Sequence, residues 1–192
     1  MNWINLRILL MMDKSILRKN LLIKRSKVKN RSQKELKIFQ RIEPIINNNS
    51  LVVGGYISVK SEVNLGLFLN FLLKNKFSLC LPYIKEPESP LVFKELTKNT
   101  KLLRGKYNIM HPNNTTLLVP NIILTPLVGF DISKNRIGYG GGYYDRTIEC
   151  LEKKNEVLKI GIAFDEQETM KIPNEKYDKK LDVIITPTRL IV

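Results

Sequence analysis

The chain has 192 residues, a length typical of one domain, and 43% of them are hydrophobic. This apolar fraction excludes a disordered polyelectrolyte, so we expect a sizeable packed core. Lys and Arg total 32 against 18 Asp and Glu, a formal net charge of +14, and residues 1–41 hold 12 of the cations with only two acids. Such a basic segment is compatible with a nucleic-acid partner, and equally with a lysine-rich composition on solvated helix faces.

The composition also limits the available chemistry. The two cysteines, Cys80 and Cys150, lie far apart without CxxC spacing, and His111 is the only histidine. A disulfide framework, a zinc site and a histidine-based triad are therefore not expected, and a reducing cytoplasm is the expected compartment. No apolar run reaches the roughly 20 residues of a membrane span, so no membrane association is predicted.

The N-terminal residues 1–12 combine one arginine with a short apolar run, but no small-x-small cleavage site follows. We expect an unstructured extension here, with Met11 or Met12 as candidate starts of the biological chain. Asp13 or Ser15 can then cap a helix that begins near Lys14. Its buried stripe is expected to consist of apolar residues at helical spacing: Leu17, Leu21 and Val28, with Ile16 and Ile23 beside them.

Helical and strand patterns alternate along the rest of the chain. Helices are predicted over 32–46, 65–74 and 143–153, and strands over 51–57, 77–81, 121–131, 158–164 and 182–186. The stretch 90–105 is ambiguous, and a hairpin around 91–93 is one interpretation. Because strands alternate with helices, we predict an α/β fold, a three-layer sandwich around a mostly parallel, Rossmann-like open sheet. Without a repeat or linker, residues 13–192 are predicted to form a single domain.

The strongest local signal is the segment from Arg136 to Arg146, RIGYGGGYYDR, between a buried strand and a helix. Glycines there let backbone N–H groups approach an anion, and the helix N-terminus adds a favourable dipole. The two arginines add planar cations suited to phosphate oxygens. The spacing matches neither a P-loop nor a dinucleotide fingerprint, because tyrosines stand at 143 and 144. An anion-binding loop is favoured over a purely structural helix-entry turn.

The order of motifs resembles the 5-formyltetrahydrofolate cyclo-ligase family, also called 5,10-methenyltetrahydrofolate synthetases. The family's K-x-x-L-R helix is matched at 14–18, its segment with a glutamate at 57–63, and its central signature R-x-G-x-G-x-G-Y-Y-D at 136–145, after the family-like 129–131. Its C-terminal part resembles 161–167, Ile172-Pro173, Asp178 and 182–186. The chain departs from the family at Leu65, where threonine is usual, and at His111-Pro112, where Glu-Pro is usual.

The resemblance implies a role for each matched position. ATP would be bound by the basic helix and the glycine-rich loop, through Lys14, Ser15, Ile16, Leu17, Arg18, Arg136, Ile137, Gly138, Tyr139, Gly140, Gly141, Gly142, Tyr143 and Tyr144. The folate substrate would be bordered by Ile57, Glu62, Tyr139, Gly140, Gly141, Gly142 and Tyr143. Magnesium would be held by Asp145 and Asp178. The catalytic candidates are Arg136, Tyr143 and Asp145.

The implied reaction cyclises 5-formyltetrahydrofolate to 5,10-methenyltetrahydrofolate with MgATP, and releases ADP and phosphate after a phosphorylated formyl intermediate. Such a transfer needs cations, N–H donors and Mg²⁺ around the γ-phosphate rather than a protein nucleophile. The expected partners are therefore small molecules, with neither nucleic acid nor membrane, and the enzyme is expected to be a monomer.

Other interpretations stay open. A basic nucleic-acid-binding module would bind with steep salt dependence, although no RNA-recognition aromatic signature, zinc finger or KH loop occurs in the sequence. A folate-binding family member with little turnover is the other alternative. Individual residues also have structural interpretations: Lys14 and Arg18 as a solvated helix face, Glu62 as a cap of the helix starting near Asn64, Asp178 as a turn residue, and Tyr143 and Tyr144 as core.

Overall fold

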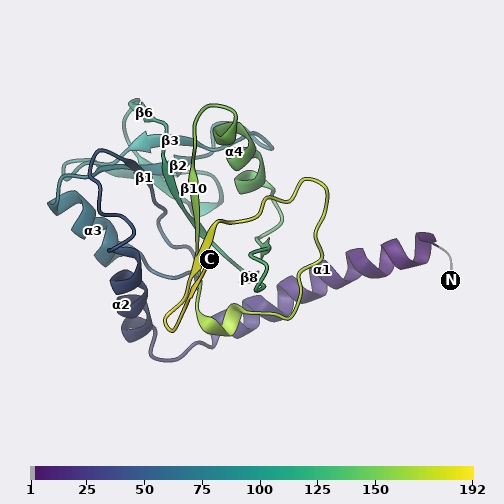
Figure 1. Cartoon of the computed structure of the whole chain (residues 1–192). Helices are drawn as coiled ribbons and strands as arrows, with labels where there is room; N and C mark the ends of the chain where they lie inside the picture. The colour runs from purple at the N-terminus through teal and green to yellow at the C-terminus, as the bar shows by residue number, and fades with distance from the viewer. Residues whose placement is uncertain (1–2) are drawn as a thin grey trace.

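The structure is a computed structural model that describes residues 3–192, with side chains described from Lys14 onward. Its centre is an eight-stranded sheet (Figure 1), in the order β12 (Leu190–Ile191), β11 (Val183–Ile185), β10 (Leu158–Ile162), β7 (Ile122–Pro126), β1 (Val52–Gly54), β2 (Ser78–Tyr83), β3 (Val92–Glu95) and β6 (Leu117–Leu118). The five strands from β11 to β2 pair in parallel, and β12, β3 and β6 each join by an antiparallel pairing. The predicted mostly parallel sheet is confirmed.

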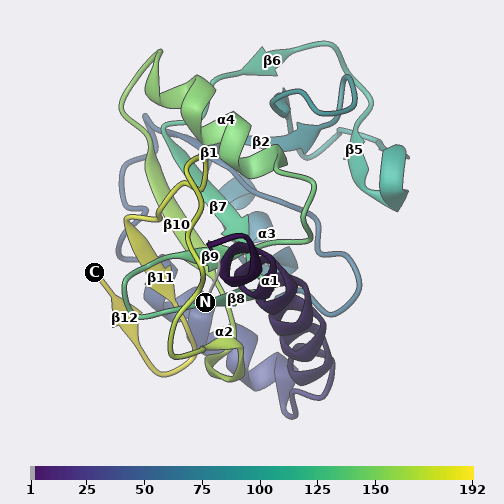
Figure 2. The ribbon, with the colours of Figure 1, turned by 90° about the vertical axis from the view of Figure 1, so that its right-hand side faces the viewer.

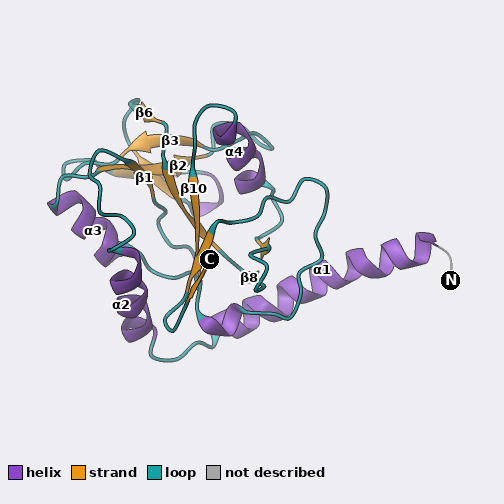
Figure 3. Cartoon of the chain, viewed as in Figure 1, coloured by secondary structure: helices purple, strands orange, loops and turns teal. Residues whose placement is uncertain are grey.

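Helices cover both faces of this sheet. The helices α2 (Arg31–Ile42) and α3 (Gly66–Lys74) lie on one face, and α4 (Tyr143–Glu152) lies on the other (Figures 1 and 3). The apolar run of β7 serves both layers: Ile122 and Leu124 pack into the cluster that contains α2 and α3, while Ile123 packs with α4. Because successive strand residues point to opposite faces, a continuous apolar run marks a strand covered on both sides. The predicted three-layer α/β sandwich is confirmed.

The first helix, α1 (Trp3–Ser26), begins earlier than predicted. Residues 3–12 form its first turns, so the expected unstructured extension is wrong for them, and residues 1 and 2 lie outside the described part of the chain. No Gly or Pro interrupts residues 3–26, so nothing in the sequence stops the helix from extending toward the N-terminus. In Figure 1 this part of α1 projects away from the sheet. That residues 13–192 form a single domain stays a prediction.

The buried stripe of α1 is narrower than predicted. Leu21 is buried and Leu17 packs beside it, and Val28 is buried just after the helix ends, but Ile16 and Ile23 are exposed. At 100° per residue, Ile23 lies about 200° around the helix from Leu21, on the opposite side. Leu21 packs with Val128, Ile137 and Ile172, which belong to loops and a short strand rather than to the large sheet. The helix therefore lies against the loops at one end of the sheet.

Several element boundaries differ from the sequence prediction. The second helix ends at Ile42 rather than 46, and β2 continues through Pro82. The strand β1 ends at Gly54, which pairs with Cys80, so β1 does not reach as far as Pro82. The N–H that proline lacks is therefore not needed for a hydrogen bond to β1. The ambiguous stretch holds β3, which pairs with β2, and β4 (Leu102–Arg104), which forms a separate hairpin with β5 (Met110–Pro112). The run 121–131 divides into β7 and β8 (Gly129–Phe130), and β8 pairs with β9 (Arg136–Ile137).

The connections define where a ligand can bind. From β1 the chain passes through α3 to β2 on one side, and from β7 it passes through α4 to β10 on the other side. The neighbours β1 and β7 therefore form a topological switch point, and open α/β sheets bind ligands outside the carboxyl ends of the strands at such a point. Figure 2 shows α1 in front of this region. Within residues 3–192 no helix is long and apolar enough to cross a membrane.

The core packing of α3 gives a direct test of the sandwich. Leu72 is 0% exposed under the sheet, whereas Leu67 on the same helix is 64% exposed. We expect Leu72→Ala to lower the free energy of unfolding by about 2–5 kcal/mol, because it removes buried methyl groups and leaves a cavity. The matched variant Leu67→Ala should change it by no more than about 0.5 kcal/mol. Urea denaturation of both variants measures the difference, and equal losses would contradict this placement of α3.

Candidate active site

Four segments meet at the switch point: the loop after β1, the glycine-rich loop after β9, the C-terminal half of α1 and the loop before β11. Arg18 of α1 donates from Nε to the carbonyl of Gly138 at 2.8 Å. Lys14, one turn earlier, places Nζ 2.8 Å from Oδ2 of Asp178 and 3.1 Å from Oε1 of Glu175. Both cations of the predicted basic helix are thus engaged at the site rather than solvated on a free helix face.

The glycine-rich loop has a backbone that only glycine adopts readily. Gly140 has φ 100° and Gly142, the N-cap of α4, has φ 65°, a region that side chains strain. Two of its carbonyls accept hydrogen bonds from side chains, that of Gly138 from Arg18 and that of Gly141 from Nη2 of Arg146 at 2.7 Å. Among the described hydrogen bonds, none is donated by an N–H of residues 138–142. Glycine-rich backbone whose N–H groups have no described partner, next to the N-terminus of α4, suits the binding of an anion.

A partly buried ion pair lies beside this loop. Arg136 of β9 donates from Nη2 to Oδ1 of Asp145, in the first turn of α4, at 2.8 Å. The same oxygen accepts the backbone N–H of Lys179 at 3.0 Å, which ties α4 to the loop carrying Asp178. The Nε of Arg136 is buried without a partner in the described part of the chain. The predicted catalytic pair Arg136 and Asp145 therefore stands in direct contact.

The two predicted metal-binding carboxylates reach the same region from neighbouring segments. Asp178 uses Oδ2 to accept both Lys14 and the N–H of Glu175, and Asp145 uses Oδ1 for Arg136 and Lys179. Among the described residues, no three or more metal-ligating side chains lie close enough together to hold a metal ion. Mg²⁺ commonly binds one or two carboxylates and completes its shell with phosphate oxygens and water. The donor set fits a Mg²⁺ ion shared with a phosphate, and does not fit a site built by protein alone.

The loop after β1 contributes a buried carboxyl group. Glu62 is 5% exposed, and its Oε2 accepts the N–H of Val59 at 2.8 Å. Burial raises the pKa of Glu62 to about 7, partly opposed by that hydrogen bond and by the charges of Arg25 and Lys60. Glu62 does not cap α3, because the first free N–H of that helix, on Gly66, is bound by Asn64. The predicted substrate contact Ile57 lies in the same loop, partly buried against the core.

The three tyrosines of the loop have different surroundings. Tyr139 is 42% exposed, and its hydroxyl accepts a hydrogen bond from Nη2 of Arg25. Tyr143 packs edge-on against Tyr107 of the β4–β5 hairpin, with ring centroids 6.3 Å apart. Tyr144 packs against the core cluster beneath α4, and burial raises the pKa of its hydroxyl. Tyr143 packs against the same cluster, so Tyr139 is the most exposed of the three.

Sequence reasoning missed Arg25, which is 0% exposed. Its signal was its position: Leu17, Leu21 and Arg25 recur every four residues, so the arginine continues an apolar stripe. Tyr107 was also missed, because nothing local in its sequence indicates the contact with Tyr143. Of the two departures from the family pattern, Leu65 is buried in the core at the start of α3. The His111 ring packs on Tyr83, with ring centroids 4.6 Å apart.

Of the remaining predicted residues, Leu17 packs with Leu21, and Ser15 and Ile16 are exposed on α1. The structure thus brings Lys14, Arg18, Arg136, Asp145 and Asp178 together around residues 138–142. The loop with Ile57 and Glu62 joins them through Arg25. The binding roles of these residues stay predictions.

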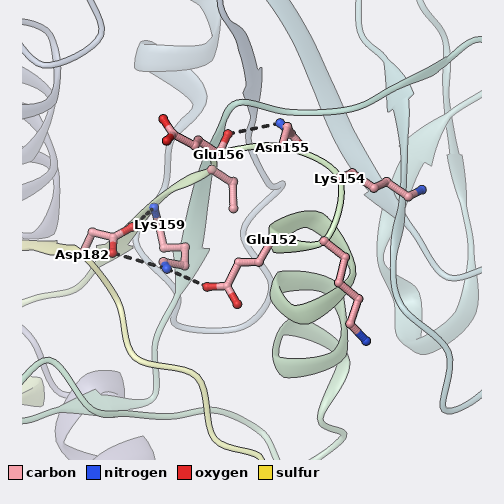
Figure 4. A pocket seen from close by; sticks show the side chains of 8 residues that line it. Glu152, Lys154, Asn155, Glu156, Lys159 and Asp182 are labelled. Atoms are coloured by element: carbon pink, nitrogen blue, oxygen red, sulfur yellow. Dashed lines mark hydrogen bonds and ion pairs between the residues drawn. The ribbon is translucent and has the colours of Figure 1, made fainter.

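A separate cavity of about 510 Å³ lies at the amino end of β10, lined by residues 152–157 with Lys159 and Asp182 (Figure 4). Its charged groups neutralise one another, since Nζ of Lys159 lies 2.8 Å from Glu152 and 3.3 Å from Asp182. Ligands of open parallel sheets bind at the opposite, carboxyl end of the strands. None of the predicted site residues lines this cavity, so it is not the candidate active site.

Fold and site together define a class: an α/β protein with an open parallel sheet and a basic, glycine-rich anion cradle at its switch point. The model of the 5-formyltetrahydrofolate cyclo-ligase family matches residues 10–187. The chain therefore belongs to this family and is an enzyme of the ligase class.

Similar proteins cover nearly the whole chain. The 5-formyltetrahydrofolate cyclo-ligase of Mycoplasma genitalium is 35% identical over 91% of this chain and 98% of its own. The structure of a 5,10-methenyltetrahydrofolate synthetase from Mycoplasma pneumoniae superposes with a TM-score of 0.73 at 27% identity, covering 91% of this chain and 99% of that one. The corresponding Aquifex aeolicus structure has a TM-score of 0.78 at 27% identity, over 93% and 91% of the two chains. The similarity extends over more than nine-tenths of this chain.

The buried carboxyl group predicts a pH-dependent stability. Because the pKa of Glu62 is about 7 in the folded chain against 4.5 as its ordinary value, the folded state favours the protonated form. Its contribution is fully present below about pH 4.5 and is lost as pH rises through about 7. Relative to wild type, Glu62→Gln should gain stability on the order of 3 kcal/mol between about pH 4.5 and pH 8. Urea unfolding at several pH values measures this gain, and a pH-independent difference would contradict the assignment.

Proposed function

We propose that this enzyme cyclises 5-formyltetrahydrofolate to 5,10-methenyltetrahydrofolate with ATP and Mg²⁺, releasing ADP and phosphate. The observation that carries the proposal is the glycine-rich loop, whose N–H groups have no partner among the described hydrogen bonds, while the carbonyls of Gly138 and Gly141 are bound by Arg18 and Arg146. Membership of the cyclo-ligase family supplies the reaction, and this loop supplies a place for the phosphates. ATP as the co-substrate agrees with both.

The phosphates of ATP are placed between the loop and α1. The N–H groups of residues 138–142 and the N-terminus of α4 donate to the phosphate oxygens, with Arg18 and Arg136 beside them. Lys14 exchanges its ion pairs with Asp178 and Glu175 for a phosphate oxygen when ATP enters. Mg²⁺, when bound with ATP, would neutralise the charge that builds up on the transferring phosphoryl group, with Asp145 and Asp178 as its protein ligands.

The folate lies on the side of the loop that faces β1. Glu62 accepts hydrogen bonds from the N–H donors of the pterin, and Ile57 and Tyr139 provide apolar and aromatic contact surface. This arrangement holds the formyl oxygen in line with the γ-phosphate. Transfer of the phosphoryl group requires this alignment whether its transition state is associative or dissociative. The phosphorylated formyl group is then attacked by N10 of the same molecule, which closes the ring and expels phosphate. No protein nucleophile takes part.

The N-terminal basic charge has roles within this site. Lys14, Arg18 and Arg25 all bind groups of the same chain rather than forming a free basic face. We therefore propose small-molecule substrates, and neither nucleic acid nor a membrane as partner. A monomer in the cytoplasm completes the proposal.

The decisive experiment mixes purified protein with 5-formyltetrahydrofolate and MgATP and follows the near-ultraviolet absorbance of the conjugated methenyl product. We expect the signal to require both ATP and Mg²⁺, with ADP and phosphate formed in equal amounts. Binding of 5-formyltetrahydrofolate without turnover at high enzyme concentration would identify a non-catalytic family member. Salt-dependent binding of nucleic acid, with no folate binding, would favour the nucleic-acid alternative.

The role of Asp145 is tested by Asp145→Asn, which keeps an oxygen acceptor for Arg136 and the N–H of Lys179 but removes the charge. We expect the Mg²⁺ concentration for half-maximal rate to rise about tenfold or more, and the rate to fall. The variant should still fold, as circular dichroism measures, with a lowered melting temperature because Arg136 loses its charged partner. The matched control is Glu149→Gln, an exposed acid of the same helix whose described ion pair is with Lys153. This variant should behave as wild type. Normal Mg²⁺ dependence in Asp145→Asn would refute the metal assignment.

A further inference from the structure

Arg25 of α1 is the largest fully buried side chain among the residues whose side chains are described. Burial of a guanidinium is costly unless its N–H groups are satisfied. Each of its nitrogens serves a different segment: Nε donates to Oγ of Ser61 at 3.1 Å, Nη1 to the carbonyl of Leu127 at 2.7 Å, and Nη2 to the hydroxyl of Tyr139. Ser61 follows β1, Leu127 follows β7, and Tyr139 lies in the glycine-rich loop. One side chain thus joins all three loops at the switch point.

The contact with Tyr139 fixes an otherwise exposed ring. The guanidinium carbon of Arg25 lies 5.3 Å from the ring centroid, and Nζ of Lys60 lies 5.4 Å from it. A hydrogen bond to the hydroxyl and two cations near the ring leave Tyr139 little rotational freedom. Its orientation relative to Ser61 and Glu62 is therefore set by the protein before any ligand arrives.

No acid forms an ion pair with Arg25 within the described side chains, since its three donors all go to neutral oxygens. A side chain kept only for stability would gain more from a carboxylate partner or an apolar replacement. The single ammonium group of a lysine could reach one of these three oxygens, whereas the planar guanidinium of arginine donates to all three at once. The geometry of the guanidinium is thus matched to joining loops.

We propose that Arg25 is a positioning residue that holds Tyr139 and the Glu62 loop in their relative places and thereby sets the affinity for the folate-type substrate. Arg25 does not itself contact the substrate. The inference rests on the proposed function, because Tyr139 and Glu62 border the folate there. It predicts an effect on folate binding that is transmitted through the Tyr139 hydroxyl.

The test is a double-mutant cycle of Arg25→Lys and Tyr139→Phe, read as the Kd for 5-formyltetrahydrofolate by calorimetry without ATP, and as KM for each substrate. We expect Tyr139→Phe to weaken folate binding about three- to tenfold and Arg25→Lys about tenfold or more. The double variant should bind no more weakly than Arg25→Lys alone, because the second change removes a contact already lost.

Arg31→Lys is the matched control. Arg31 donates to the carbonyls of Arg25, Ser61 and Glu62 at 3.2, 2.9 and 2.8 Å, and it has no described hydrogen bond to Tyr139. In a double variant, the fold-changes in the folate Kd caused by Arg31→Lys and Tyr139→Phe should multiply, to within about twofold. The inference would be overturned if the fold-changes in Kd of Arg25→Lys and Tyr139→Phe simply multiplied in the double variant. It would also be overturned if Arg31 were coupled to Tyr139 as strongly as Arg25 is. Either result would mean that these substitutions loosen the site in general.

The remaining outcomes are also decisive. If Arg25→Lys does not fold, Tyr139→Phe alone decides, because an unchanged Kd would overturn the inference and the expected weakening would support it. If wild-type protein binds folate without turning it over, the proposed catalysis is overturned. The double-mutant cycle can then still be measured through the folate Kd. Absence of folate binding by wild type would overturn both.

Discussion

The packing of one face of α1 against the loops of the sheet is the interaction on which the site depends. Lys14, Arg18, Leu21 and Arg25 are spaced four, three and four residues apart, so at 100° per residue they fall within about 60° of one another. Leu21 supplies the apolar anchor in the cluster with Val128, Ile137 and Ile172. The cations on either side of it reach the glycine-rich loop, the loop before β11 and the loop after β1. Because these loops come from different parts of the chain, their relative positions are set by the helix that contacts them all.

Much of the fold could be predicted because its strands are covered on both sides. The runs around Ile123 and Ile160 are apolar without alternation, which is the pattern of a central parallel strand, and helical patterns lie between them. The errors fall where a local pattern does not decide. Pro82 suggests the end of a strand, yet it lies where the neighbouring strand has already stopped. The start of α1 depends on how far a helix extends without a breaker, and residues 3–12 contain none.

The candidate site divides in the same way. The glycine-rich loop could be predicted because its residues are consecutive. The motifs that match the family added Lys14, Glu62 and Asp178 to the predicted site. Arg25 could not be singled out on composition, because one arginine in a basic helix resembles its solvated neighbours. The contact of Asp145 with the N–H of Lys179 joins residues 34 positions apart, and no local sequence pattern indicates such a pairing. Burial, rather than residue type, distinguishes Arg25 and Glu62, together with Asp131 and Arg136, from the other charged groups whose exposure is described.

The ion pairs of Lys14 with Asp178 and Glu175 have a consequence for the enzyme without nucleotide. Lys14, Arg18 and Arg136 converge on one small region, and their mutual repulsion would work against the packing of α1. The carboxylates act as internal counterions that compensate this charge, so the binding surface is assembled in advance. In the proposed function, an arriving polyphosphate therefore competes with Asp178 and Glu175 for Lys14, and its binding has to break ion pairs that are already formed.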